Sequence, residues 1–241
     1  MNNRFKHFIS IFFPKKCISC GEIICVDKDI CDICYAELPV IEKRCDICGN
    51  PKEYCFCTSR VFYFEKCICV FENSGTAKQS YYRYKLSGKP HYVGWFAKKI
   101  ANEIKASYPD MDFDAVCAVP SSALSIMNRG FRHSELLASR VAGILGIPYI
   151  KDMLGAKGFR KPQHKSAAKE RIENVRGKYY IKRRADGMKI LLIDDIRTTG
   201  ATLSECSHML LLGGAQNVRC ATLLATIYKK NKNKNGDING N

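Results

Sequence analysis

The stretch from Lys189 to Leu203, KILLIDDIRTTGATL, constrains the fold of this chain more than any other part of it. Its apolar run Ile190–Ile193 predicts a buried strand. That strand ends in two adjacent carboxylates, Asp194 and Asp195, which are called the acidic pair below. A polar turn rich in threonine and glycine follows, and a helical pattern begins directly after it.

This order of elements predicts a site for a phosphorylated sugar. The backbone N–H groups and threonine hydroxyls of the turn would bind a phosphate at the start of the helix. The carboxylates would accept hydrogen bonds from vicinal ribose hydroxyls and hold a Mg²⁺ ion. The alternative is a buried strand that ends in acidic residues by chance, which leaves both carboxylates without partners.

Cysteine is the second informative residue type, because nine of the 14 cysteines fall between Cys17 and Cys57. A C-x-x-C pair on a tight turn directs two thiolates at one metal, and two such pairs complete a four-sulfur zinc site. Eight of the nine cysteines form close pairs: Cys17/Cys20, Cys31/Cys34, Cys45/Cys48 and Cys55/Cys57. They predict one or two structural zinc ions.

The simplest pairing is sequential, with Cys17, Cys20, Cys31 and Cys34 as a first quartet and Cys45, Cys48, Cys55 and Cys57 as a second. A crossed arrangement stays open, and Cys25 is left over. Disulfides would suit a secreted protein, but no secretory signal is visible. An iron–sulfur cluster also takes four thiolates, although zinc-ribbon-like quartets favour zinc. The remaining cysteines are expected to be small core residues: Cys67, Cys69, Cys117, Cys206 and Cys220.

The charge of the chain is strongly positive, with 39 Lys and Arg against 23 Asp and Glu, a formal net charge of +16. Two zinc ions on eight thiolates would lower this to about +12. Residues 151–189 alone hold 13 basic and four acidic side chains. Such a surface suits phosphate-rich partners, including nucleic acid. The alternative is a solvated basic loop.

The chain divides near residue 60, where the cysteine-rich part ends. We expect a zinc-binding module over residues 1–60, an α/β domain over 61–228, and a disordered basic tail over 229–241. No apolar run reaches the length that spans a membrane, so the sequence predicts a soluble, cytoplasmic protein.

Strand and helix patterns alternate after residue 60. Strands are expected at 67–71, 114–119, 190–193 and 218–225, and helices at 95–104, 136–145 and 203–212. A glycine follows each of the last two helices, at Gly146 and Gly213. Alternation of this kind predicts a mostly parallel sheet with flanking helices. Ligands of such sheets bind beyond the carboxyl ends of the strands, where the acidic pair lies.

The stretch Lys189–Leu203 resembles the phosphoribosyl pyrophosphate (PRPP) motif of the type I phosphoribosyltransferases. From Cys17 to Ala225 the chain resembles the ComF family, the group of ComFC and GntX, which join an N-terminal double zinc ribbon to a phosphoribosyltransferase-like domain. Four more segments carry the resemblance: Tyr84–Gly88, Val119–Pro120, Arg129–Phe131, and Gln163 with Arg171–Asn174. Ser121-Ser122 and Arg132-His133 depart from the family pattern, so the resemblance supports PRPP binding more than transfer.

The resemblance implies roles for single residues. Asp194 and Asp195 would be the catalytic pair and hold the ribose diol and Mg²⁺. The 5′-phosphate would bind Thr198, Thr199, Gly200, Ala201 and Thr202, called the phosphate loop below. The pyrophosphate side would include Pro120 and Ser121, with Lys85 and Arg129 as cations; these two could equally be solvated surface charges. The segment around Lys161, Gln163, Lys165 and Arg171 resembles a mobile loop, and its three basic residues are candidates for binding nucleic acid.

The resemblance also implies a function: handling incoming single-stranded DNA during natural transformation, with a pocket for PRPP and Mg²⁺. Two alternatives stay open, a phosphoribosyltransferase acting on an unknown acceptor and a regulator that senses PRPP. The expected partners are single-stranded DNA, PRPP or a related phosphosugar, and competence proteins such as a helicase or recombination factor. Five tyrosines beside basic residues are candidates for stacking on bases: Tyr81, Tyr82, Tyr84, Tyr179 and Tyr180.

Overall fold

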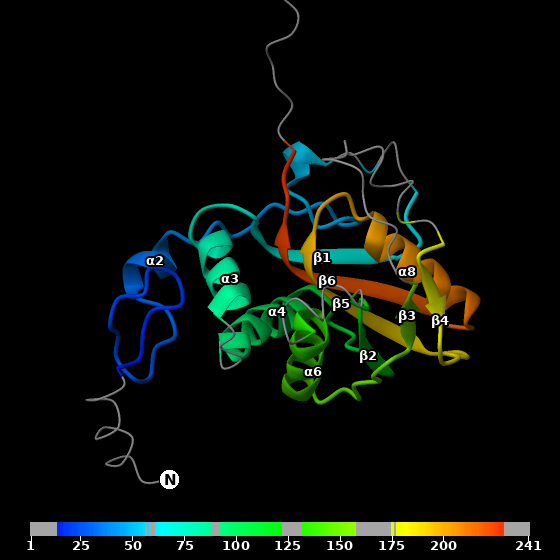
Figure 1. Cartoon of the computed structure of the whole chain (residues 1–241). Helices are drawn as coiled ribbons and strands as arrows, with labels where there is room; N and C mark the ends of the chain where they lie inside the picture. The colour runs from blue at the N-terminus through cyan, green and yellow to red at the C-terminus, as the bar shows by residue number, and fades with distance from the viewer. Residues whose placement is uncertain are drawn as a thin grey trace, which may run out of the picture.

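The computed structural model describes residues 14–55, 57, 61–87, 92–121, 132–157, 175 and 177–228. Its centre is a four-stranded sheet in the order β1-β6-β5-β2, in which all neighbouring strands run parallel (Figure 1). The strands are β1 (Lys66–Glu72), β2 (Ala115–Ala118), β5 (Lys189–Arg197) and β6 (Asn217–Ala225). The expected α/β fold with a parallel sheet is therefore confirmed.

The sheet is buried on both faces. Along β5, Leu191 and Ile193 point into one hydrophobic core, whereas Ile190 and Leu192 point into a second core. Successive side chains of a strand alternate between faces, so a strand covered on both sides needs an unbroken apolar run. The run Ile190–Ile193 meets that need.

Helices cover the first face, and a helix and a small hairpin cover the second (Figure 1). The first core contains residues of α3 (Gly75–Ser87), α4 (Val93–Ser107) and α6 (His133–Leu145). The second contains residues of α8 (Ala201–Leu212) and of the antiparallel pair β3 (Leu154–Ala156) and β4 (Tyr179–Ile181). The helix α6 ends at Gly146, whose φ of 72° is left-handed, as the predicted stop requires.

The two cysteine quartets lie in segments that pack on different parts of this sheet. The first segment contains the short helix α2 (Asp32–Ala36) and lies beside α3, where Ser19 Oγ donates to the carbonyl of Thr76. The second contains the turn η1 (Lys52–Tyr54) and lies along β1, where the N–H of Cys67 donates to the carbonyl of Ile47. Each segment thus helps to bury the sheet or its helices.

Two details differ from the sequence-based expectation. The strand β5 continues through the acidic pair to Arg197, because Asp194, Ile196 and Arg197 keep their pairing with β6. The helix α3 and the β3–β4 hairpin were not predicted. The domain boundary at residue 60 stays a prediction, and the tail 229–241 lies outside the described residues. None of the helices in the described ranges is long and apolar enough to cross a membrane.

Candidate functional site

The acidic pair lies near the carboxyl end of β5, next to the end of β2. The register pairs Ala118 with Ile193, and the N–H of Val119 donates to the carbonyl of Ile193 at 3.0 Å. Pro120 and Ser121 follow directly, so the predicted pyrophosphate residues leave the sheet beside the acidic pair. The structure thus brings these two parts of the predicted site together.

Asp194 is a buried carboxyl group with local partners. Its Oδ1 accepts a hydrogen bond from Ser134 Oγ at 3.0 Å and one from the N–H of Asp195 at 2.9 Å. Burial, followed by the neighbouring charge of Asp195, raises the pKa of Asp194 well above its usual range. The surroundings of Asp194 therefore disfavour its ionised form.

Asp195 is instead stabilised as an anion. Its Oδ2 accepts hydrogen bonds from the Tyr81 hydroxyl and from Lys85 Nζ, the latter at 3.3 Å, and its Oδ1 accepts from the N–H of Ile196 at 2.7 Å. Burial acts to raise the pKa of Asp195, but the Lys85 ammonium and the hydrogen bond from Tyr81 outweigh it and lower that pKa. The two carboxyl groups of the pair therefore differ in how readily they ionise.

The helix α3 supplies two of these partners from one face. Tyr81 and Lys85 are four residues apart, so they lie one turn apart on the same side of the helix. Lys85 was predicted as a pyrophosphate cation, and the structure places it on Asp195. Sequence reasoning missed Tyr81 and Ser134 as site residues. The spacing to Lys85 would have indicated Tyr81 had α3 been recognised, whereas Ser134 has no such signal.

The phosphate loop connects β5 to α8. Gly200 precedes the first residue of α8 and has a φ of 81°, a left-handed conformation that side chains rarely adopt. Thr199 is buried, and its Oγ1 accepts a hydrogen bond from the N–H of Ala201 at 3.3 Å. Thr198 and Thr202 are partly exposed. The N-terminus of α8 therefore faces the same edge of the sheet as the acidic pair.

We expect Gly200→Ala to distort the phosphate loop. An added Cβ would lie 3.0 Å from a ring carbon of Phe62, and the left-handed φ would itself cost about 1–2 kcal/mol. Urea unfolding would measure this loss. The matched control is Gly143→Ala inside α6, where a Cβ meets nothing within 4 Å and should leave stability equal or higher. Equal stabilities of the two variants would contradict this view of the loop.

The eight paired cysteines form two clusters in the sequential arrangement. In each quartet the sulfur atoms all lie within 4.8 Å of one another. Neighbouring sulfurs are 3.8 Å apart for Cys20 and Cys31 and 3.7 Å apart for Cys48 and Cys55. Tetrahedral zinc with Zn–S bonds of about 2.3 Å requires S···S distances of about 3.8 Å. Both quartets therefore fit structural zinc.

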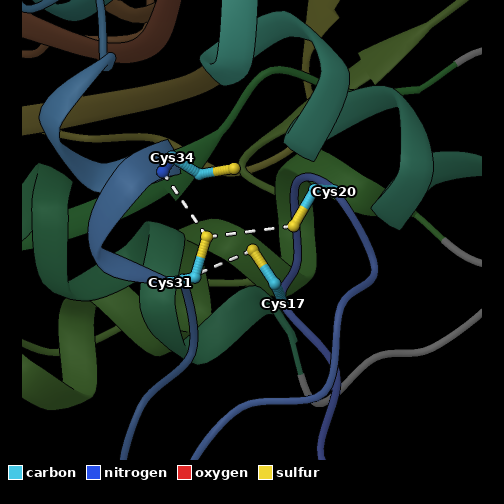
Figure 2. Close-up of side chains that lie close together, drawn as sticks. All are labelled: Cys17, Cys20, Cys31 and Cys34. Atoms are coloured by element: carbon cyan, nitrogen blue, oxygen red, sulfur yellow. Dashed lines mark hydrogen bonds between the residues drawn. The ribbon is translucent and has the colours of Figure 1, made fainter.

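Figure 2 shows the first quartet, with Cys17 and Cys20 on one loop and Cys31 and Cys34 at the start of α2. Their sulfurs surround a common centre. Backbone N–H groups point at two of the sulfurs, because the N–H of Cys31 donates to Cys17 Sγ at 3.3 Å and that of Cys34 donates to Cys31 Sγ. Cys25 is exposed and belongs to neither quartet, as expected.

Arg129, Lys161, Lys165 and Arg171 lie outside the described residues, as does Gln163. The expectation that all five tyrosines could stack on bases is wrong for Tyr81 and Tyr84, which are buried in the core beneath α3. Tyr82 and Tyr180 are exposed.

Comparisons with known proteins agree with this arrangement. The model of the phosphoribosyl transferase domain matches residues 124–241, and that of the double zinc ribbon domain matches residues 8–69. The competence protein ComFC of Bacillus subtilis is 27% identical over 82% of this chain and 85% of its own length. The DNA utilization protein YhgH of Salmonella typhimurium is 22% identical over 82% and 91% of the two chains. Competence protein F of Haemophilus influenzae is 21% identical over 86% and 96%.

Proposed function

Because this chain belongs to the ComF family, we propose that it handles incoming single-stranded DNA during natural transformation and binds PRPP with Mg²⁺ at the acidic pair. Three relatives whose names refer to competence or DNA utilization support the DNA-related role. The net charge of +16 supports a polyanionic partner.

The observation that carries the PRPP proposal is one edge of the sheet that holds both an acidic pair and a helix N-terminus. The 5′-phosphate would bind the N–H groups of the phosphate loop at the start of α8. Asp194 and Asp195 would accept hydrogen bonds from the ribose hydroxyls. Carboxylate oxygens are ligands that suit Mg²⁺, which would neutralise the pyrophosphate charge when bound.

Lys85 has a role that follows from its position on Asp195. A cation at the acidic pair would compete with the Lys85 ammonium for Asp195 Oδ2, which lies 3.3 Å from Lys85 Nζ. Lys85 would then turn to the pyrophosphate as a positive partner. Tyr81 would keep Asp195 oriented while Lys85 changes partner.

The helix α3 offers a physical link between the pocket and a DNA surface. Tyr81 and Lys85 reach the acidic pair from one face, while Lys78, Tyr82 and Arg83 are exposed on α3. An exposed aromatic ring between basic side chains suits stacking on unpaired bases and contact with phosphates. Ligand binding that moves Lys85 would then also change the DNA affinity of the exposed face of α3.

The test is a titration of single- and double-stranded oligonucleotides, with and without PRPP and Mg²⁺, at two salt concentrations. We expect tighter binding of single strands, a steep loss of affinity with salt, and a change in affinity on adding PRPP. The double variant Asp194→Ala/Asp195→Ala should remove the response to PRPP. Absence of DNA binding at low salt would overturn the DNA-handling proposal.

A second function, transfer of phosphoribose to an acceptor, is favoured by the same acidic pair and phosphate loop. It predicts pyrophosphate release that depends on an added acceptor. Release of pyrophosphate with a nucleobase or nucleotide acceptor, together with no DNA binding, would favour this alternative.

A further inference from the structure

Arg197 is a buried cation at the end of β5, one residue before the phosphate loop. Its side chain is 4% exposed, and its Nη1 donates to Asn50 Oδ1 at 2.5 Å, where Asn50 is itself 7% exposed. Its Nε has no hydrogen-bond partner in the described structure. None of the ion pairs formed among the described residues includes Arg197.

A buried guanidinium needs a compensating negative charge, because the effective penalty for burying an ion is several kcal/mol. Burial acts to lower the pKa of Arg197, but attraction to the sulfurs of four cysteines in their thiolate form outweighs it and raises that pKa: Cys69, Cys67, Cys48 and Cys57. Cys48 and Cys57 belong to the second quartet. Four thiolates on one Zn²⁺ carry a net charge of −2, so the loaded second quartet supplies the missing countercharge.

The same guanidinium also lies against the phosphate loop. A Cβ built on Gly200 would be 3.3 Å from Arg197 Nε and 3.5 Å from Arg197 Nη2, so the guanidinium is in close range of the glycine backbone. The carbonyl of Arg197 is fixed by the N–H of Thr226 at 2.8 Å. One side chain thus binds Asn50 in the segment of the second quartet and lies beside Gly200 of the phosphate loop.

We propose that Arg197 is the countercharge of the loaded second zinc site, and that zinc loading of this site orders the phosphate loop through Arg197. Loss of zinc removes the negative charge that holds the guanidinium in place. The guanidinium then moves toward solvent. The phosphate loop loses the side chain that lies beside Gly200. Arg197 is a positioning residue in this scheme.

The first quartet provides an internal reference. It packs beside α3, where the exposed Arg83 donates to the carbonyl of Ser19. Zinc loss from the first quartet should therefore leave the order of the phosphate loop unchanged. The two quartets differ in this respect although both consist of four cysteines.

The test measures zinc release to a chromophoric chelator and hydrogen exchange of the peptide that covers residues 196–203. In a Cys20→Ser background only the second quartet keeps four ligands, and there Arg197→Met should speed zinc release by at least about tenfold. In a Cys55→Ser background only the first quartet is intact, and Arg197→Met should leave its zinc release unchanged. The retained first zinc shows that the variant is folded.

Hydrogen exchange of the phosphate loop should increase in Arg197→Met and in Cys55→Ser, but not in Cys20→Ser. Unchanged zinc release in Arg197→Met, or an unchanged loop in Cys55→Ser, would overturn the proposal. So would a Cys69→Ala variant that behaves like Arg197→Met, because the Cys69 thiol would then be the countercharge. Neither measurement uses PRPP or DNA, so the outcome is independent of the proposed function.

Discussion

Replacing Asp195 by asparagine is expected to weaken the binding of PRPP in the presence of Mg²⁺ by about a hundredfold or more. Asp195 is the member of the acidic pair that Lys85 and Tyr81 hold as an anion. An amide carries no negative charge for Mg²⁺ and leaves the Lys85 ammonium without its partner. A hundredfold loss corresponds to about 2.7 kcal/mol, a common size for a buried charged interaction. Isothermal titration calorimetry would measure the affinity.

The control for this prediction is Asp186→Asn. Asp186 is exposed and pairs with Arg184 on the surface, so its replacement should leave the affinity for PRPP unchanged. A thermal melt of each variant separates loss of binding from loss of fold. An affinity for Asp195→Asn within about twofold of that of the unchanged protein would remove Asp195 from the proposed site.

Replacing Cys17 by serine is expected to release one zinc ion and to lower the melting temperature by about 10 °C. Cys17 is fully buried in the first core and is a member of the first quartet. Structural zinc contributes on the order of 10 kcal/mol to the folding of small peptides. A loss of about a third of this energy would lower the melting temperature of a chain of this size by about 10 °C. Elemental analysis and a calorimetric melt would give both values.

Cys25→Ser is the matched control, because Cys25 lies in the same segment but is exposed and outside both quartets. It should keep all of the zinc and the same melting temperature. Equal zinc contents in Cys17→Ser and Cys25→Ser would show that the first quartet does not hold zinc.

The strands of the sheet and the helices that pack on it were predictable because each has a regular pattern of buried residues. Strands covered on both faces favour continuous apolar runs, as at Ile190–Ile193. The strand at Val218–Ala225 is also mostly apolar, with Arg219 and Thr222 as its polar residues. The helix α4 buries one side only, so its apolar residues recur at helical spacing. The cysteine quartets were also predictable, since metal coordination imposes short spacings that are visible in the sequence.

The helix α3 was missed for the opposite reason. Its buried side includes tyrosines with polar hydroxyl groups and its exposed side includes Leu86, so polarity hardly differs between its two faces. No helical period was therefore visible from which to place Tyr81 beside Asp195. The β3–β4 hairpin joins segments separated by more than twenty residues, and each strand has only three residues.

The acidic pair and the phosphate loop were predicted as groups, but their individual charge states were not. Burial raises the pKa of Asp194, whereas Lys85 and Tyr81, which come from a distant part of the chain, lower that of Asp195. The burial of Arg197 was not predictable for the same reason. Its charge is visible in the motif, whereas its burial against Asn50 depends on how the second cysteine segment packs along β1.

The cysteine-rich segment contributes apolar residues to both hydrophobic cores of the sheet. Ile18 and Ile30 belong to the core beneath α3 and α4, and Ile41 belongs to the core on the other face of the sheet. A truncation that begins near residue 61 would uncover apolar area on both sides at once. Fusions and deletions should therefore keep residues 14–57 together with the sheet. Without them, the C-terminal part would fold alone only if its uncovered apolar surfaces were covered in another way.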